Sequence, residues 1–296
     1  MINNKVSIIM NCHNGEKYLV ETINSLFKQT YKNWELIFFD NQSTDNSKLI
    51  INKFKDKRIK YFYSKFINLG LARKKALNLC SGKFITFLDV DDIWTNKKLE
   101  IQVVTLNKNK NCALCFSNSI FFEKNKKWFL YDKKPEDGFI FFKLLKKYYI
   151  SFDTVLFTKK SLLSLDHHID EKFNIIHDMD LIIRLSKKNK FIYIDYPLSY
   201  WRLHDKSFSH NKIRTINIEK INLLKKLVAD EKNIKLRKKI YTLFSKNFLK
   251  TKADECIVSN KKYLIIKEVL NMRPFKLQNI LYFFTVFMFK IFCKKN

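Results

Sequence analysis

Short apolar runs alternate with segments of helical spacing along the first ninety residues of the chain. The runs and the helical segments are, in chain order, 6–10, 16–29, 34–39, 45–55, 59–63, 70–80 and 84–88. Apolar runs of this length indicate buried strands, and the segments between them have the spacing of helices. Such alternation is typical of a mostly parallel sheet with crossover helices, so we predict an α/β fold.

Polar residues follow three of the predicted strands directly. They occupy positions 11–15, 40–45 and 89–92. In open α/β sheets, ligands bind at the carboxyl ends of the strands. We therefore expect the functional site in these three loops.

The carboxyl-terminal third has a different pattern, with apolar residues at helical spacing. They are Ile213, Ile216, Ile221, Leu224 and Val228, then Leu236, Ile240, Leu243 and Phe248. We predict two or three helices here, and a division into a catalytic domain at 1–210 and a helical region at 211–296. The last stretch, 261–295, combines apolar residues with flanking lysines. This pattern is typical of a helix in a membrane interface, and a helix packed on its own domain is the alternative.

The net charge of +29 favours anionic partners. A codon bias toward lysine is a competing explanation of this charge. Residues 206–296 hold 22 Lys and Arg against 6 Asp and Glu, a net +16. Nucleic acid, anionic membrane and phosphorylated substrates would all suit this charge. A nucleic-acid-binding protein remains a distant alternative, because the chain has no RRM-type stacking motif and no helix-turn-helix signal.

The six cysteines are scattered without the spacing of a disulfide framework, which favours a reducing compartment such as the cytoplasm. Cys112 and Cys115 form a C-x-x-C pair within an apolar run, and we expect them to be core residues rather than zinc ligands.

The apolar run at 6–10 is too short for a signal peptide. The uncharged stretch at 277–289 is shorter than the ~20 residues of a membrane-spanning helix.

Three carboxylates crowd the exit of the strand predicted at 84–88, in the sequence Asp89-Val90-Asp91-Asp92. Such crowding is electrostatically costly unless a cation neutralises it. A divalent ion held by one or two carboxylates plus substrate phosphates would do so, and Mg²⁺ or Mn²⁺ fits this ligand set. The alternative is that an aspartate here caps the following helix.

Four segments in this order resemble the family-2 glycosyltransferases. They read V-S-I-I-M-N-C-H-N-G-E-K-Y-L, E-L-I-F-F-D-N-Q-S-T-D-N-S, N-L-G-L-A-R and G-K-F-I-T-F-L-D-V-D-D-I-W. The resemblance is dense over 5–105 and thinner to about 210. It implies the GT-A fold, a Rossmann-like sheet with flanking helices. It also implies an inverting transfer of a sugar from a nucleotide donor to an acceptor hydroxyl.

The resemblance implies that the donor nucleoside lies against Asn11, His13, Asn14, Asp40 and Asn41. Two of these segments depart from the family pattern. Many members have Pro-x-Tyr-Asn at the first loop, and Asp-Asp-Gly where this chain has Asp-Asn-Gln. The identity of the base is therefore open, although an amide can still hydrogen-bond a base edge.

The remaining donor-side residues also come from the resemblance. Arg73 matches an arginine near the nucleotide, where it would pair with donor phosphate or base; a solvated helix residue is the alternative. Asp89 would lie near the ribose and the metal, and Asp91 would bind the metal directly. His204, in Y-W-R-L-H-D-K-S-F-S, would complete the coordination unless it is a plain surface histidine.

The catalytic base implied by the resemblance is Asp178, in F-N-I-I-H-D-M-D-L-I-I-R-L. A carboxylate there would take the proton of the acceptor hydroxyl. Asp180 is the competing choice, and Asp153 follows if neither serves. His177 stands where many relatives carry an acid. The alternative to a catalytic role is that Asp178 caps the helix.

We thus predict a metal-dependent inverting glycosyltransferase that uses a nucleotide sugar, with a weak preference for UDP. The acceptor would be a glycan or lipid-linked intermediate of surface polysaccharide or glycolipid synthesis, reached at the inner face of the cell membrane. A family member without catalysis, binding nucleotide sugar or glycan, is the main alternative. A sugar nucleotidyltransferase would need a Gly-rich phosphate loop, which four scattered glycines do not supply.

Overall fold

The computed structural model describes residues 4–205 and 212–258, which divide into two compact units. The first comprises 1–140 and 149–216, and the second comprises 141–148 and 217–296. The sequence pattern led us to expect the division near 210. The short segment at 141–148 belongs to the second unit although it is far from 217–296 in the sequence. No local sequence pattern predicts this association.

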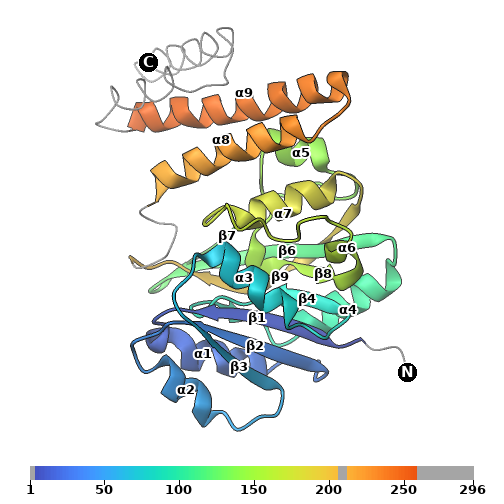
Figure 1. The fold of residues 1–296 in the computed structure, drawn as a ribbon. Helices are drawn as coiled ribbons and strands as arrows, with labels where there is room; N and C mark the ends of the chain where they lie inside the picture. The colour runs from blue at the N-terminus through green and yellow to red at the C-terminus, as the bar shows by residue number, and fades with distance from the viewer. Residues whose placement is uncertain (1–3, 206–211, 259–296) are drawn as a thin grey trace. The chain divides into compact units, whose positions relative to one another are not determined.

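The first unit is built on one mixed sheet (Figure 1). Its strands are β1 (Val6–Cys12), β2 (Trp34–Asn41), β3 (Ile59–Ser64), β4 (Phe84–Phe87), β5 (Ile93–Trp94), β6 (Cys112–Glu123), β7 (Lys126–Phe129), β8 (Leu156–Thr158) and β9 (Lys190–Arg202). They are ordered β3-β2-β1-β4-β8-β6-β9-β5, with β7 paired to β6. The first four strands are parallel, and β8 joins them antiparallel to β4. The predicted α/β class is confirmed.

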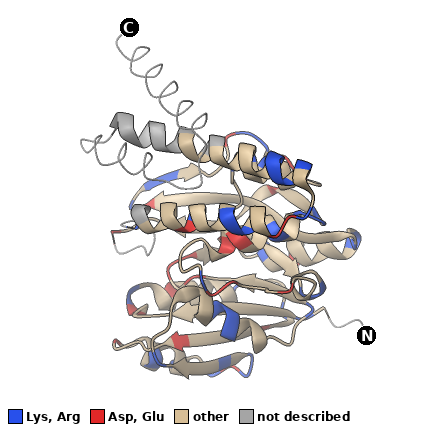
Figure 2. Cartoon of the chain, turned by 45° about the horizontal axis from the view of Figure 1, so that its top comes forward, with Lys and Arg blue, Asp and Glu red and all other residues tan. Residues whose placement is uncertain are grey.

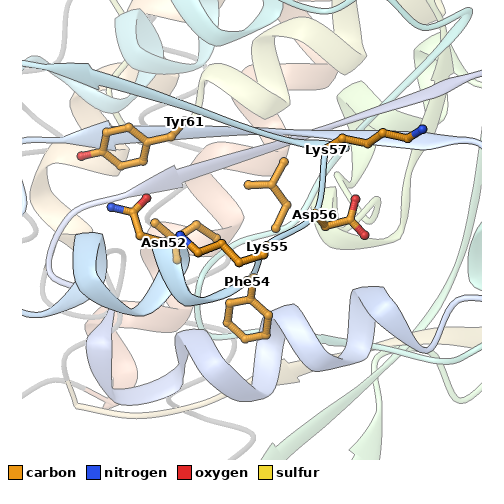
Figure 3. Close-up of a pocket in the computed structure, with 8 residues that line it drawn as sticks. Asn52, Phe54, Lys55, Asp56, Lys57 and Tyr61 are labelled. Atoms are coloured by element: carbon orange, nitrogen blue, oxygen red, sulfur yellow. The ribbon is translucent and has the colours of Figure 1, made fainter.

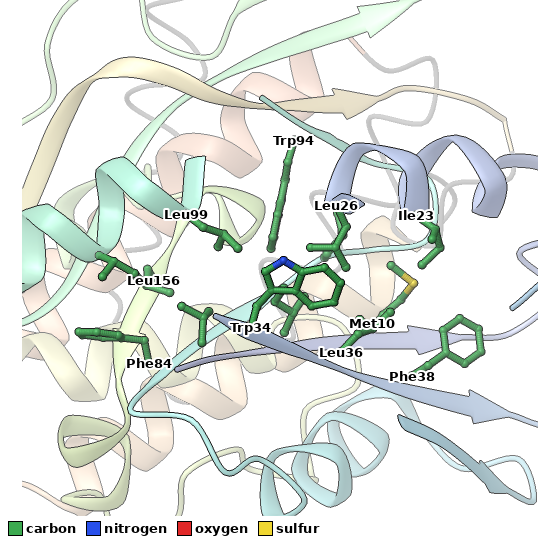
Figure 4. Close-up of a cluster of buried hydrophobic side chains, with 14 of the residues drawn as sticks. Met10, Ile23, Leu26, Trp34, Leu36, Phe38, Phe84, Trp94, Leu99 and Leu156 are labelled. Atoms are coloured by element: carbon green, nitrogen blue, oxygen red, sulfur yellow. The ribbon is translucent and has the colours of Figure 1, made fainter. Parts of the chain in front are cut away.

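The helices of the first unit follow the predicted crossovers. They are α1 (Glu16–Phe27), α2 (Ser47–Lys53), α3 (Leu69–Asn78), α4 (Lys98–Lys108), α6 (Lys159–Leu163) and α7 (His177–Ser186), with a 3-10 turn η1 (Phe152–Thr154). Apolar residues of α1, α2 and α4 pack on one face of the sheet. There they surround Trp34 and Trp94 in the main core cluster (Figure 4).

Helix α3 lies on the opposite face of the sheet and is fastened to the loop before α7. Asn68 accepts a hydrogen bond from the amide of Leu71 and so caps α3, while its Nδ2 donates to the carbonyl of Glu171. At Gly70 a Cβ would lie 2.3 Å from the carbonyl oxygen of Phe173, so only glycine permits this approach. The close packing brings Arg73, one turn further on, against the start of α7.

The second unit is helical in its described part. It contains α5 (Phe141–Lys146), most of α8 (Ile213–Ala229) and α9 (Ile234–Val258). Two of the predicted carboxyl-terminal helices are therefore present, and the predicted interfacial stretch at 261–295 lies outside the described residues. None of the helices described is long and apolar enough to span a bilayer. Cys112 and Cys115 are buried free thiols, as predicted.

Candidate active site

The three predicted loops meet at one edge of the sheet because β1, β2 and β4 are adjacent and parallel. Cys12 at the end of β1 is in register with Asp40 of β2, and Ile9 with Phe87 of β4. The loop after each strand therefore opens at the same edge. This confirms that the polar segments after these strands are neighbours in space.

The loops after β1 and β2 are tied together by their own hydrogen bonds. Asn14, with φ of 59°, accepts from the amide of Thr44 at 2.8 Å through Oδ1, and its own amide donates to Ser43 Oγ. His13 places Nδ1 2.9 Å from the carbonyl oxygen of Asn41. The exposed ring of His13 meets Phe66 edge-on, with centroids 5.0 Å apart. Phe66, which the sequence reading missed, is 60% exposed beside it.

Asp40 and Asn41 are buried, and their side chains are engaged within the fold. Asp40 accepts from the amide of Ser43 and from the hydroxyl of Tyr61. The amide of Asn41 exchanges two hydrogen bonds with the backbone of Ile67, at 2.8 and 3.0 Å. Both residues thus shape the loops, and neither presents a free side-chain group in this arrangement.

Asn11 differs from them, because its side-chain oxygen and nitrogen are both buried without a hydrogen-bond partner. It lies two residues beyond Ile9, and side chains alternate along a strand. Ile9 is in register with Phe87, over which the guanidinium of Arg73 stacks at 5.6 Å. Asn11 therefore faces the Arg73 side of the sheet. A buried amide without partners is costly, and a ligand could satisfy it.

Arg73 is almost fully buried and joins two parts of the site. Its Nη2 donates to Asp89 Oδ1 at 2.5 Å, and its Nη1 lies 2.5 Å from His177 Nε2. The guanidinium also stacks over Phe152 at 5.0 Å. The side chain of Asp89 is half exposed, so its second oxygen can meet a ligand from solvent. The sequence alternative of a solvated Arg73 is wrong.

Asp91 and His204 come together from opposite halves of the first unit. His204 Nε2 lies 2.9 Å from Asp91 Oδ2, and the ring of Tyr18 packs beside the histidine. Arg202 supports the pair, because its Nε donates to the carbonyl of Asp91. Burial, and then the charge of Asp89, raise the pKa of Asp91. His204 is thus engaged at the site and is not a plain surface residue.

Asp92 is buried and serves the loop. Its Oδ1 accepts from the amide of Arg202, and burial with the nearby charges of Asp91 and Asp153 holds its pKa well above the usual range. It is not a helix cap, since α4 begins after Lys97.

The side chains around Asp91 supply some, but not all, of the ligands that a divalent ion needs. Within 4–205 and 212–258 no three His, Cys, Asp or Glu side chains converge as a complete metal cage. A carboxylate and an imidazole that already lie side by side, next to half-exposed Asp89, make an open site. Mg²⁺ and Mn²⁺ commonly take one or two protein ligands plus substrate phosphates, which is the set this site can complete.

The two aspartates at the start of α7 have different environments. Asp180 is fully buried and paired with Arg184, whose Nε and Nη2 donate at 3.0 and 2.6 Å. Asp178 receives no side-chain hydrogen bond from the described residues, and burial raises its pKa to about 6 although Arg73 opposes the shift. No described side chain thus competes for the carboxyl of Asp178, whereas Arg184 occupies that of Asp180.

Asp153, the reserve candidate for the base, is buried and bonded to the hydroxyls of Ser119, Ser151 and Ser199. Lys98 nearby is also fully buried and donates to Gln102. Burial lowers the pKa of Lys98 to about 8, and the charge of Asp153 opposes this. The sequence pattern gave no sign of this polar group, because its members are scattered over a hundred residues.

A surface hollow of about 370 Å³ lies beside α2 and β3 (Figure 3). Its lining includes Asn52, Phe54, Lys55, Asp56 and Lys57. It contains none of the predicted site residues. The candidate active site therefore lies at the strand ends, apart from this hollow.

A family model agrees with the geometry of the strand ends. The model described as Glycosyl transferase family 2 matches residues 7–165, more than half of the chain. The chain belongs to glycosyltransferase family 2. The matched region contains the loops after β1 and β2, Arg73 and the three aspartates after β4.

Relatives and solved structures are consistent with this membership. The family-2 chain is 34% identical over 216 residues to the UDP-Glc:alpha-D-GlcNAc-diphosphoundecaprenol beta-1,3-glucosyltransferase WfgD of Escherichia coli, covering 71% of this chain and 82% of the relative. Its fold matches S. aureus TarS 1-349 in complex with UDP, with a TM-score of 0.67, 17% identity and coverage of 90% and 78%. It also matches the Pyrobaculum calidifontis mannosyltransferase PcManGT in complex with GDP-Man and Mn2+, with a TM-score of 0.61, 12% identity and coverage of 95% and 85%. The GT-A fold is thereby confirmed.

Proposed function

We propose that this glycosyltransferase transfers a sugar from a UDP-sugar to a hydroxyl of a lipid-linked glycan, with inversion at the anomeric carbon. The proposal rests on the environment of Asp178. A carboxylate with a raised pKa and no competing described side chain, beside the donor loops, is suited to accept the hydroxyl proton during attack. A single displacement of this kind inverts the anomeric centre.

The proposed donor side has buried polar groups without partners and exposed ring surface. The buried amide of Asn11 lacks partners, His13 and Phe66 expose ring surface, and Arg73 and Asp89 meet at the loop after β4. In this proposal the nucleobase of the donor contacts His13 and Phe66. Asn14, Asp40 and Asn41 shape the loops around it. The preference for UDP follows the UDP-Glc donor named for the E. coli relative.

Asp91, His204 and Asp89 would hold a divalent ion together with the donor diphosphate, and Mg²⁺ or Mn²⁺ is proposed. Such an ion supplies Lewis-acid stabilisation of the departing nucleoside diphosphate. The Mn2+ in the mannosyltransferase structure favours this chemistry in a similar fold. Arg73 keeps Asp89 oriented, and Arg202 fixes the backbone of Asp91.

The acceptor is proposed by analogy with the E. coli relative, which is named for a diphosphoundecaprenol-linked GlcNAc acceptor. Such a substrate lies in a membrane, and we propose that this chain reaches it at the inner membrane face. Lysines of α5 and α9 offer a surface for that contact. Lys146, Lys235, Lys238 and Lys239 are exposed, and none forms an ion pair within the described part.

The test is a transfer assay with UDP-, GDP- and dTDP-sugars, a lipid-diphosphate GlcNAc acceptor and Mn²⁺ or Mg²⁺. We expect turnover with a UDP-sugar and a product with inverted anomeric configuration, read by NMR. A product of retained configuration would refute the mechanism. Donor binding without turnover on any lipid or glycan acceptor would instead favour a binding protein without catalysis.

A further inference from the structure

The guanidinium of Arg73 lies near two neighbouring side chains of α7 but binds only one. Its Nη1 contacts Nε2 of His177 at 2.5 Å, and no hydrogen bond joins it to Asp178. The charge of Arg73 still acts on Asp178, because it opposes the rise in the pKa of that carboxyl. The choice of partner by Arg73 therefore bears on the proposed base.

The partners of His177 fix its protonation state. A guanidinium can only donate, so Nε2 of His177 is the acceptor. Nδ1 lies 3.2 Å from the carbonyl oxygen of Asn174 and must donate to it. The ring is therefore neutral, with its proton on Nδ1. Burial, and then the charge of Arg73, keep the pKa of His177 well below its usual range.

Packing orients both side chains of this contact. His177 is 1% exposed and meets Phe152 edge-on, with centroids 6.1 Å apart. Arg73 is 5% exposed and stacks on the same phenylalanine. One ring thus orients both members of the contact. The tether of α3 to the loop before α7 fixes their spacing.

We propose that His177 is a positioning residue: its neutral acceptor nitrogen holds Arg73 on Asp89 and away from Asp178. This deepens, and rests on, the proposed function, in which Asp178 is the base. An arginine that paired with Asp178 would occupy the lone pairs needed by the acceptor hydroxyl and would stabilise the charged form. A carboxylate at position 177 would hold Arg73 too, but it would put a second negative charge beside the base. A neutral acceptor avoids both effects.

The test compares His177→Gln with His177→Met in the full chain. The two side chains are similar in shape, but only glutamine keeps an acceptor near the position of Nε2. Transfer by wild type should fall as the pH drops below about 6, the pKa of Asp178. We expect His177→Gln to keep this midpoint and a kcat within about threefold of wild type. In His177→Met the midpoint should move down by about one unit and kcat at neutral pH should fall by about tenfold, because Arg73 pairs with Asp178.

Equal midpoints in folded Gln and Met variants, whatever their Tm, would overturn the proposal. If the Met variant does not fold, His177→Glu decides: we expect its midpoint above that of the Gln variant, and coincidence of the two overturns the proposal. Asp178→Asn separates this test from the proposed function. Retained turnover in Asp178→Asn would refute the base itself, whereas loss of turnover there with unchanged midpoints in the His177 variants would refute only the positioning role.

Discussion

In the proposed function, Asp91 and His204 supply only part of the coordination of a divalent ion. One carboxylate and one imidazole lie 2.9 Å apart, and the donor diphosphate would supply the other ligands. The ion and the donor should therefore bind cooperatively. Either alone should bind weakly.

Asp91→Asn should lower transfer by at least about tenfold at a fixed Mn²⁺ concentration, because the amide loses the charge that attracts the ion. Asp56→Asn, at the surface hollow, is the matched control and should behave as wild type. The measurement is initial rate against Mn²⁺ concentration, with circular dichroism to confirm folding. Full activity of Asp91→Asn in the presence of a chelator would contradict the assignment.

Asp178→Asn should reduce turnover by ~10²–10⁴-fold while donor binding is retained, because the amide keeps the shape and cannot take a proton. Asp180→Asn should instead lower the free energy of unfolding by about 3 kcal/mol, since it breaks a buried ion pair with Arg184. Transfer rates per folded molecule and urea denaturation measure the two effects. Loss of turnover in Asp180→Asn alone would place the base two residues later.

At the scale of elements, the contact of α3 with the loop before α7 controls the geometry of Arg73. Gly70→Ala should force these segments apart, because the added Cβ would meet the carbonyl of Phe173. Overpacking of this kind costs about 1–3 kcal/mol of stability. Transfer should fall more than stability predicts, since Arg73 moves with α3. A variant with wild-type kcat and lowered Tm would show that the site tolerates the shift.

The sequence predicted the elements that have local signals and missed those that depend on distant contacts. The four parallel strands and the three helices between them carry periodicity and polar exits, so they were found with ends shifted by a few residues. The association of α5 with α9 has no local signature. At the site, the three loops were predicted from their position after the strands, and Asp178 was proposed as the base from the resemblance. The engagement of Asp40 and Asn41, and the buried Asp153 and Lys98, depend on partners that only the fold brings together.

At the scale of the whole molecule, the positive charge is unevenly distributed along the chain. Lys and Arg recur along the helices of the second unit (Figure 2), and Lys235, Lys238 and Lys239 are exposed there. If this surface meets a bilayer, the attraction is about 1 kcal/mol per lysine close to anionic lipid. Exposed Ile234, beside these lysines, would add apolar contact.

Replacement of Lys235, Lys238 and Lys239 by Gln should weaken binding to vesicles that contain phosphatidylglycerol by at least about tenfold at low salt. Replacement of Lys53, Lys55 and Lys57 by Gln removes the same charge from the first unit and should have a smaller effect. Co-sedimentation measures both, with phosphatidylcholine vesicles as the baseline. Equal losses in the two triple variants would mean that total charge, and not this surface, governs binding.

The site joins residues that are far apart in the chain: 104 positions separate Arg73 from His177, and 113 separate Asp91 from His204. Contacts of such long range form late in folding, because closing the long loop between them costs conformational entropy before the contact is gained. During synthesis the donor-side loops can take shape while the residues that complete the site are still unmade. A refolding chain should therefore regain helix and strand content before it regains turnover. The time between those two events would measure how long β9 and α7 need to dock on an otherwise formed sheet.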